Sequence, residues 1–374
     1  MHAPERKQSQ RRRLLQGCAA LLFGARFGPL RAASRPLYVD GLLSSLPERN
    51  QDLEASGLDA FICDVADVEE MRDPDGTIRY RRTFATCDRS LDAALEHIRD
   101  ELPDAHVATR GSEIGTRAGT GIFLQFQSCE PVAEDLSRIA YFYGKGLRVL
   151  QITHHNDNAF GGGSIELKPR GLTALGFEGV AEMNRVGMLV DVSHASERTA
   201  LDVAGHTKAP FILSHGACRA IVDHPRCASD AVIRAIAGRG GVMGVFMMSF
   251  WLTRWPRPTV DHYVAQLRHV IEVGGLETVG VANDFSIAGE MALSALDNDN
   301  ERGVKNYHDW WRPLQAQGMP GFERLPTHVV IPELNNLRRM QRIQEALELD
   351  GFKASEIEKI MGGNWQRVLR AVLG

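Results

Sequence analysis

The chain has 374 residues, of which 44% are hydrophobic and 24% charged, and its formal net charge is −4. These values are typical of an ordinary soluble globular protein, and the length suits one large α/β domain. Basic side chains concentrate in residues 1–34, so the remainder is clearly acidic. An acidic body without a basic patch argues against nucleic acid and against an anionic membrane as partners.

The first 34 residues resemble a bacterial export signal. The segment Gln10–Leu15 contains three consecutive arginines, as in the twin-arginine signature, and a short apolar stretch and small residues at 32–34 follow it. The apolar stretch is too short and too interrupted for a transmembrane helix. We therefore predict an export signal over 1–34 and a periplasmic or secreted protein without a transmembrane span. A disordered basic tail is the alternative.

Export makes disulfide bonds possible. The cysteines that follow the predicted signal are odd in number, so at least one thiol is left over. Their spacing matches neither a C-x-x-C motif nor a zinc ribbon. The first pairing to expect is Cys63 with Cys87.

From residue 37 onward, apolar strands alternate with amphipathic helices. The predicted strands cover 37–43, 59–66, 106–110, 121–128, 147–155, 188–193, 210–214, 241–248 and 277–285. The predicted helices cover 90–102, 134–146, 172–187, 196–206, 260–275, 332–349 and 354–373, and a loop rich in Gly, Asn, Trp and Pro occupies 286–331. This alternation predicts a parallel sheet covered by helices, arranged as a (β/α)8 TIM-type barrel in a single domain over 35–374.

Two neighbouring strands are each followed by a histidine. The strand at 188–193 leads to His194, and the strand at 210–214 leads to His215, with the helix at 196–206 between them. The carboxyl ends of barrel strands converge on one mouth, where catalytic residues collect. Two histidines there can share one metal ion, because neutral imidazole is a common zinc ligand. Capping of nearby helices is the structural alternative.

Five segments then carry a family resemblance: GLTALGFEGVAEMNRVGMLVDVSHAS, APFILSHGACRAIVDHPR, GLRVLQITHHNDN, ETVGVANDF and IMGGNWQRVL. They resemble the membrane (renal) dipeptidase family of zinc metallopeptidases, and the similarity extends from about residue 37 to the end of the chain. The resemblance implies a (β/α)8 barrel with two zinc ions. It also implies hydrolysis of dipeptides by a hydroxide that bridges the two metals.

The resemblance assigns roles to five residues. His194 and His215 match the two histidines that bind one of the zinc ions. Asp284 matches the carboxylate that contacts the attacking water and the substrate amine, and His154 matches the histidine that polarises the scissile carbonyl. Arg226 matches the arginine that receives the substrate carboxylate, a group that a guanidinium binds well; a surface salt bridge is its structural alternative.

Three ligand positions depart from the family's pattern. The family's first strand reads D-G-H-x-D, whereas this chain has Leu42 and Ser44 in place of the histidine and the second aspartate. Gln127 aligns with the metal-bridging glutamate, and a neutral amide cannot bridge two cations as a carboxylate does. We therefore predict one zinc ion or none. The one-metal site would consist of His194, His215 and Asp284 with a water.

Two functions follow from this pattern. The first is an exported dipeptidase-family metallohydrolase that acts on dipeptides or other small peptide-like amides. The alternative is a catalytically altered or inactive relative that uses His154 and Arg226 to bind or modify a small peptide-derived compound. For both functions, the expected partner is a small peptide or a peptide-derived compound. A homodimer is a further expectation that the sequence leaves open.

Several other residues have both a functional and a structural interpretation. His155 should point away from the mouth, against a helix, if it lies on the same strand as His154. Asp64 could accept a hydrogen bond from a ligand histidine or cap a turn, and Cys129 is expected to be a buried structural thiol rather than a metal thiolate. The aromatic residues of the long loop should either line a substrate pocket or anchor that loop: Trp310, Trp311 and Phe322.

Overall fold

The computed structural model describes residues 35–72 and 78–374, and the predicted export signal at 1–34 lies outside the described residues. The part from Pro36 to Gly374 forms one compact unit. Its parallel sheet has the order β1-β2-β6-β7-β8-β9-β10-β11, with β5 added beside β6. The strands are β1 Val39–Leu43, β2 Ala60–Asp64, β5 Ala105–Val107, β6 Thr120–Phe126, β7 Leu147–Gln151, β8 Leu189–Asp191, β9 Ile212–Gly216, β10 Val242–Val245 and β11 Val279–Val281.

The sheet closes between its first and last strands. Backbone amides of Asn283 and Asp284 donate to the carbonyl of Leu42 at 3.3 and 2.9 Å, and the amide of Ser44 donates to the carbonyl of Phe285 at 3.0 Å. Eight parallel strands joined in this way form the predicted (β/α)8 barrel, which is thereby confirmed. The side chains that follow β1 and β11 are consequently brought to the same mouth.

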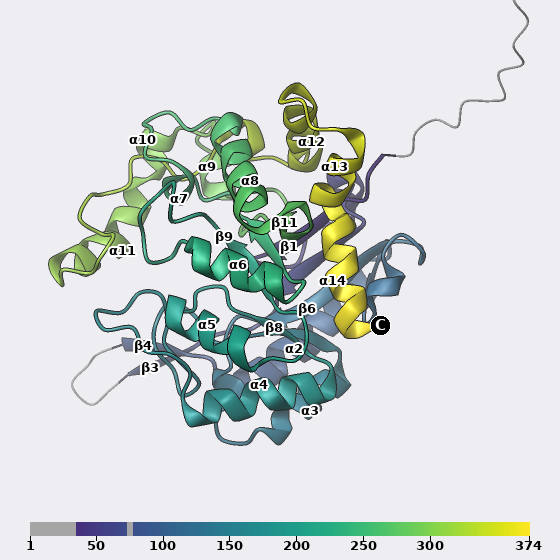
Figure 1. Ribbon diagram of the computed structural model, residues 1–374. Helices are drawn as coiled ribbons and strands as arrows, with labels where there is room; N and C mark the ends of the chain where they lie inside the picture. The colour runs from purple at the N-terminus through teal and green to yellow at the C-terminus, as the bar shows by residue number, and fades with distance from the viewer. Residues whose placement is uncertain (1–34, 73–77) are drawn as a thin grey trace, which may run out of the picture. The chain divides into compact units, whose positions relative to one another are not determined.

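Helices cover the outside of the barrel, as Figure 1 shows. They are α1 Asn50–Ser56, α2 Phe84–Glu101, α3 Ser137–Lys145, α4 Ala174–Val186, α5 Glu197–His206, α6 Asp230–Gly238, α8 Val260–Gly274, α12 Arg339–Leu349, α13 Ala354–Glu358 and α14 Asn364–Leu373. Hydroxyl N-caps fix where several begin, because Thr83, Thr173, Ser196 and Ser229 each accept a hydrogen bond from a first-turn backbone amide.

Two regions differ from the sequence prediction. The predicted loop at 286–331 contains the helices α9 Met291–Ser294, α10 Asn300–Gly303 and α11 Lys305–Ala316. The polar composition of α11 and its internal Pro313 obscure the helical period. An antiparallel hairpin of β3 Glu69–Arg72 and β4 Ile78–Arg81 also follows β2, and short α7 Ser249–Leu252 follows β10. Both regions lie beyond the carboxyl ends of barrel strands, where loops build sites.

The C-terminal helix α14 inserts Trp365 into the barrel interior. This side chain is fully buried with apolar residues of the strands, and its Nε1 donates to the carbonyl of Val281 at 3.0 Å. Three strand glycines leave room for the indole, because a Cβ on Gly41, Gly244 or Gly280 would lie 2.3, 2.9 or 2.5 Å from it. The terminal segment is therefore part of the barrel core rather than an appendage.

Two further expectations concern cysteines and membranes. The described cysteines are all free and buried, so the expected bond between Cys63 and Cys87 is not formed. Among the described residues, we find no helix that is long and apolar enough to cross a membrane.

Candidate active site

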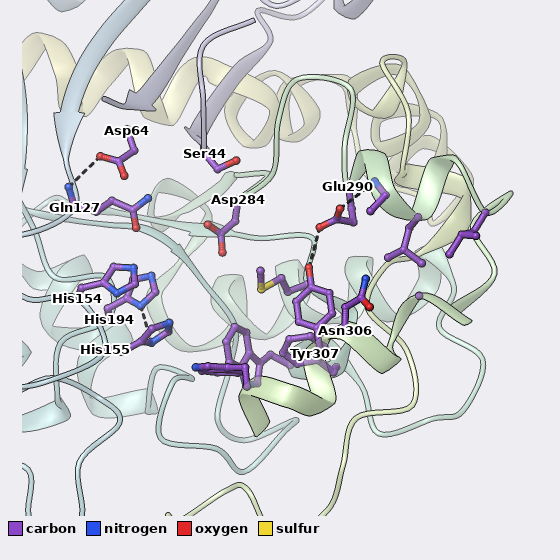
Figure 2. Close-up of a pocket in the computed structure, with 18 of the residues that line it drawn as sticks. Ser44, Asp64, Gln127, His154, His155, His194, Asp284, Glu290, Asn306 and Tyr307 are labelled. Carbon is purple, nitrogen blue, oxygen red and sulfur yellow. Dashed lines mark hydrogen bonds between the residues drawn. The ribbon is translucent and has the colours of Figure 1, made fainter. Parts of the chain in front are cut away.

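A cavity of about 600 Å³ opens at the carboxyl ends of the barrel strands (Figure 2). Its walls come from the segments that follow β1, β2, β6, β7, β8, β10 and β11, together with α11. The polar and charged lining residues are Ser44, Asp64, Arg82, Gln127, His154, His155, His194, Asp284, Glu290, Asn306 and Tyr307. Met248, Phe250, Trp251, Leu293, Leu296 and Trp310 supply an apolar wall.

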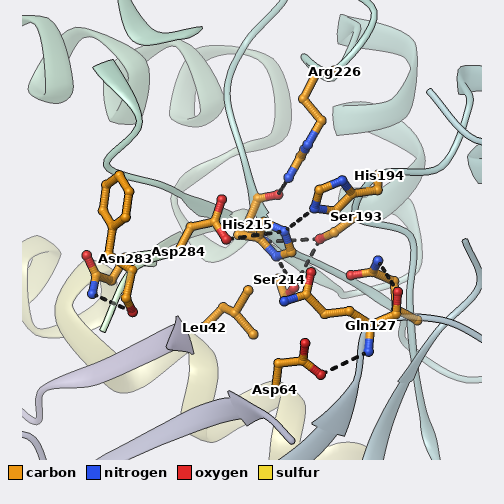
Figure 3. Close-up of polar contacts among 12 residues, drawn as sticks. Leu42, Asp64, Gln127, Ser193, His194, Ser214, His215, Arg226, Asn283 and Asp284 are labelled. Atoms are coloured by element: carbon orange, nitrogen blue, oxygen red, sulfur yellow. Dashed lines mark hydrogen bonds and ion pairs between the residues drawn. The ribbon is translucent and has the colours of Figure 1, made fainter. Parts of the chain in front are cut away.

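His194 and His215 lie together at this mouth, each at the carboxyl end of its strand. Their Nε2 atoms are 2.7 Å apart, and Asp284 Oδ1 lies 3.8 Å from His215 Nε2 (Figure 3). Both His194 and Asp284 adopt left-handed backbone conformations, with φ of 60° and 67°. Such conformations are costly for residues other than glycine, and they concentrate at sites where function fixes a side chain. The strain therefore marks two of the three residues that the sequence resemblance selects as metal ligands, His194 and Asp284.

His155 lies in this cluster, contrary to the sequence expectation. Strand β7 ends at Gln151, so His154 and His155 belong to the following loop and the alternation of a strand does not apply to them. His155 Nδ1 is 3.1 Å from His194 Nδ1, and the His154 ring stacks on the His194 ring with centroids 4.3 Å apart. Both histidines of the pair therefore face the cavity.

A buried carboxylate orients His215, although the sequence reasoning did not single it out. Ser214 Oγ donates to Asp191 Oδ2 at 2.6 Å and lies 2.8 Å from His215 Nδ1. Because the serine proton goes to the carboxylate, its oxygen is free to accept from Nδ1–H. The Nε2 lone pair of His215 is then directed toward His194. The signal in the sequence is an aspartate and two serines inside otherwise apolar strands, in VDVSH and ILSH.

Burial sets the charge state of the site. It lowers the pKa of His154, His194 and His215 well below 6.5, and that of His155 to about 3, so the imidazoles are neutral near pH 7. Burial also raises the pKa of Asp284 to about 7, opposed by the positive charge of Arg226. Neutral imidazoles and a carboxyl group that changes protonation near pH 7 suit metal binding and proton transfer.

Arg226 lies behind the cluster rather than in the wall of the cavity. It is buried, its Nη2 donates to the carbonyl of His215 at 3.2 Å, and its guanidinium lies over the rings of Phe246 and Trp251 at 5.1 and 5.6 Å. The positive charge of Arg226 therefore lies next to the backbone of His215.

The other residues that the sequence singled out have distinct positions. Asp64 lines the cavity, and its Oδ1 accepts from the backbone amides of Ala66 and Gln127 at 3.1 and 3.2 Å, so it caps a turn and does not contact a histidine. Burial raises the pKa of the Cys129 thiol, which lies in the core as expected. Trp310 lines the cavity, whereas Trp311 and Phe322 are buried and anchor the segment.

The donor set fits one metal ion. His154, His155 and His194 each offer a ring nitrogen, and these nitrogens lie within 4.8 Å of one another. The His215 nitrogen adjoins the same cluster through His194. Two positions where the resemblance expects ligands of a second ion offer no anionic group, because Leu42 is fully buried and apolar and Gln127 has only a neutral amide.

A (β/α)8 barrel with clustered imidazoles and a carboxylate at its carboxyl mouth defines a metal-dependent hydrolase-type site. Residues 75–300, more than half of the chain, match the family model for membrane dipeptidase, peptidase family M19. The chain belongs to this family of metal-dependent dipeptidases, as its sequence pattern indicated.

Individual relatives agree with this assignment. An uncharacterised dipeptidase of Schizosaccharomyces pombe is 37% identical over 172 residues, which cover 44% of this chain and 41% of that protein. Dipeptidase verJ of Clonostachys rogersoniana is 30% identical over 208 residues, covering 54% and 53%. The alignments thus span about half the length of these curated relatives. A solved amidohydrolase from Pseudomonas aeruginosa is 26% identical with a TM-score of 0.74, covering 91% of this chain and 97% of that one.

Proposed function

We propose that this protein hydrolyses a short peptide-like amide with a single metal ion held at the imidazole cluster. The observation that carries the proposal is a cluster of four histidine rings and Asp284, in which three of the histidines and Asp284 line the cavity and His215 adjoins them through His194. When bound, a zinc ion would polarise the scissile carbonyl and make a water molecule more acidic. The proposed ligands are His194 and His215, completed by Asp284 or by a ring nitrogen of His154 or His155.

The chain's own residues supply positioning and proton transfer. Asp284 has a pKa raised to about 7, so it can accept a proton from an attacking water and return it to the leaving amine. His154 is neutral and lines the cavity, where it can donate a hydrogen bond to the carbonyl oxygen. The aromatic wall, with Trp251 and Trp310, would exclude water from an apolar side chain of the substrate.

Metal analysis and a hydrolysis assay together test this proposal. Purified protein should contain about one zinc ion per chain, and His194→Ala should remove it. The exposed His206 on α5 gives a matched control, since His206→Ala should leave metal content unchanged. Hydrolysis of at least one member of an L,L and L,D dipeptide panel should accompany the metal. Two tightly bound ions per chain would contradict the one-metal site.

A second candidate is an inactive or altered relative that binds a small peptide-derived compound. The replacement of three family ligands by Leu42, Ser44 and Gln127 favours it. Zinc binding without turnover of any dipeptide, together with saturable binding of one, would select this candidate over hydrolysis.

We also propose export through the twin-arginine route. The support is the arginine triplet at 11–13, the short apolar run after it and the acidic remainder of the chain. Replacing Arg11 and Arg12 by lysine should retain the precursor in the cytoplasm, as fractionation would reveal. Normal amounts of mature protein outside the cytoplasm would contradict this route.

A further inference from the structure

The cavity contains a cationic side chain to which the proposed function gives no role. Arg82 follows strand β4 and lines the cavity with Asp64, His154 and His155. Among the cavity-lining residues that the structure describes, it is the one arginine or lysine. Because the histidines are neutral, Arg82 is the permanent positive charge of this wall.

Among the described residues, the Nε of the Arg82 guanidinium has no protein partner. That nitrogen is buried, and no described residue accepts a hydrogen bond from it. The nearby carboxylate of Asp64 is held instead by two backbone amides, those of Ala66 and Gln127. A guanidinium with an unpaired donor is matched in shape and charge by a ligand carboxylate.

Arg82 is distinct from the arginine that the family resemblance assigns to the substrate. Arg226 is enclosed behind His215, bonded to its carbonyl and covered by Phe246 and Trp251. Arg82 comes instead from the β3–β4 hairpin and reaches the cavity wall itself. The two cations therefore belong to different loops. Each has a buried Nε without a hydrogen-bond partner among the described residues, but of the two only Arg82 lines the cavity.

Arg82 and Glu290, two of the charged residues that line the cavity, lie in different parts of it. Arg82 acts on the histidine side. Burial lowers the pKa of His154 and His155, and the charge of Arg82 adds to this effect; the same charge opposes the burial that raises the pKa of Asp64 to about 6. Glu290 lies at the other side of the view in Figure 2 and accepts a 2.8 Å hydrogen bond from Tyr307 Oη. A ligand with an anionic end at the histidines would meet a matching charge there.

We propose that Arg82 binds a carboxylate of the substrate, supplied by either its C-terminus or an acidic side chain. The inference rests on the proposed function only in using the same cavity. Binding can be measured without turnover, since Trp251 and Trp310 line the cavity and report occupancy by fluorescence. The experiment titrates chelator-treated protein with L-Ala-L-Glu, L-Ala-L-Gln and L-Ala-L-Gln amide.

The variants are Arg82→Ala, Arg82→Lys and, as a matched control, Arg81→Ala, whose side chain is exposed at the end of β4. Arg82→Ala should weaken binding of the carboxylate probe on the order of ten- to a hundredfold, because a charge-assisted bidentate contact is lost. Arg82→Lys should have an intermediate effect, since it keeps the charge but not the planar fork. Should Arg82→Ala unfold, Arg82→Gln replaces it.

The probes distinguish the two sources of the carboxylate. A loss confined to L-Ala-L-Glu assigns Arg82 to an acidic side chain, and a loss for both acids but not for the amide assigns it to the C-terminus. Equal affinities of the Arg82→Ala and Arg81→Ala variants, an equal loss for the amide, or no binding of any probe to the unaltered protein would overturn the proposal. Absence of hydrolysis alone would overturn only the proposed function.

Discussion

Restoring the three missing ligands should create a second metal site at a measurable cost in stability. The variant is Leu42→His, Ser44→Asp and Gln127→Glu. Leu42 is fully buried, so its loss removes roughly 2–3 kcal/mol of apolar burial, and the new imidazole adds a buried polar ring. Without metal, the triple variant should therefore be less stable than the parent by about 3 kcal/mol.

Zinc should reverse this loss in the triple variant, in addition to the stabilisation that the proposed single site gives to the parent and to each variant. A ligand present at 100 times its Kd stabilises the folded state by about 2.7 kcal/mol. For a domain of this size, that corresponds to a rise of roughly 5 °C in Tm. Leu42→His alone is the control, because one imidazole without the two carboxylates cannot hold an ion tightly. Thermal unfolding with and without zinc, combined with elemental analysis, measures both effects.

The parent barrel and the triple variant should also differ in turnover of dipeptides. Each 1.4 kcal/mol of lost transition-state stabilisation lowers a rate about tenfold, so loss of one ion and its bridge corresponds to a deficit on the order of a thousandfold. A triple variant that gains neither a second ion nor zinc-dependent stability would refute the reasoning. Robust hydrolysis by the parent protein would show that its site is not depleted.

Three more substitutions test the structure. Ser214→Ala cuts the link between Asp191 and His215 and should weaken zinc affinity 10- to 100-fold in a competition titration; unchanged affinity would deny this link a role. Burial raises the pKa of Asp40 to about 7, so the carboxyl group keeps its proton to a higher pH in the folded state than in the unfolded state. The free energy of unfolding should therefore fall as the pH rises from about 4 to 7. Asp40→Asn should therefore flatten the pH dependence of urea unfolding by up to about 4 kcal/mol, and an unaltered slope would contradict the shift. Gly244→Ala places a Cβ 2.1 Å from the carbonyl of Ser214 and should cost at least 1–3 kcal/mol, whereas Gly238→Ala, with open space, should not.

The sequence by itself determined the barrel and the residues at the ends of its central strands. Apolar strands such as 188–193 and 210–214 can be buried only in a parallel sheet covered by helices, and the residues after them must then share one mouth. The sequence alone therefore predicts that His194, His215 and Asp284 lie close together. The absence of metal ligands at Leu42 and Gln127 was equally a property of the sequence.

Only the tertiary structure decided what surrounds those residues. Where strand β7 ends is set by its pairing with β8, which stops at Gln151, so the orientation of His155 could not follow from alternation. The hairpin that delivers Arg82 and the helix that delivers Trp310 pack over the mouth through contacts distant in sequence, for which local pattern carries no signal. The line from Asp191 through Ser214 to His215 likewise joins two strands, and no spacing within either one predicts it.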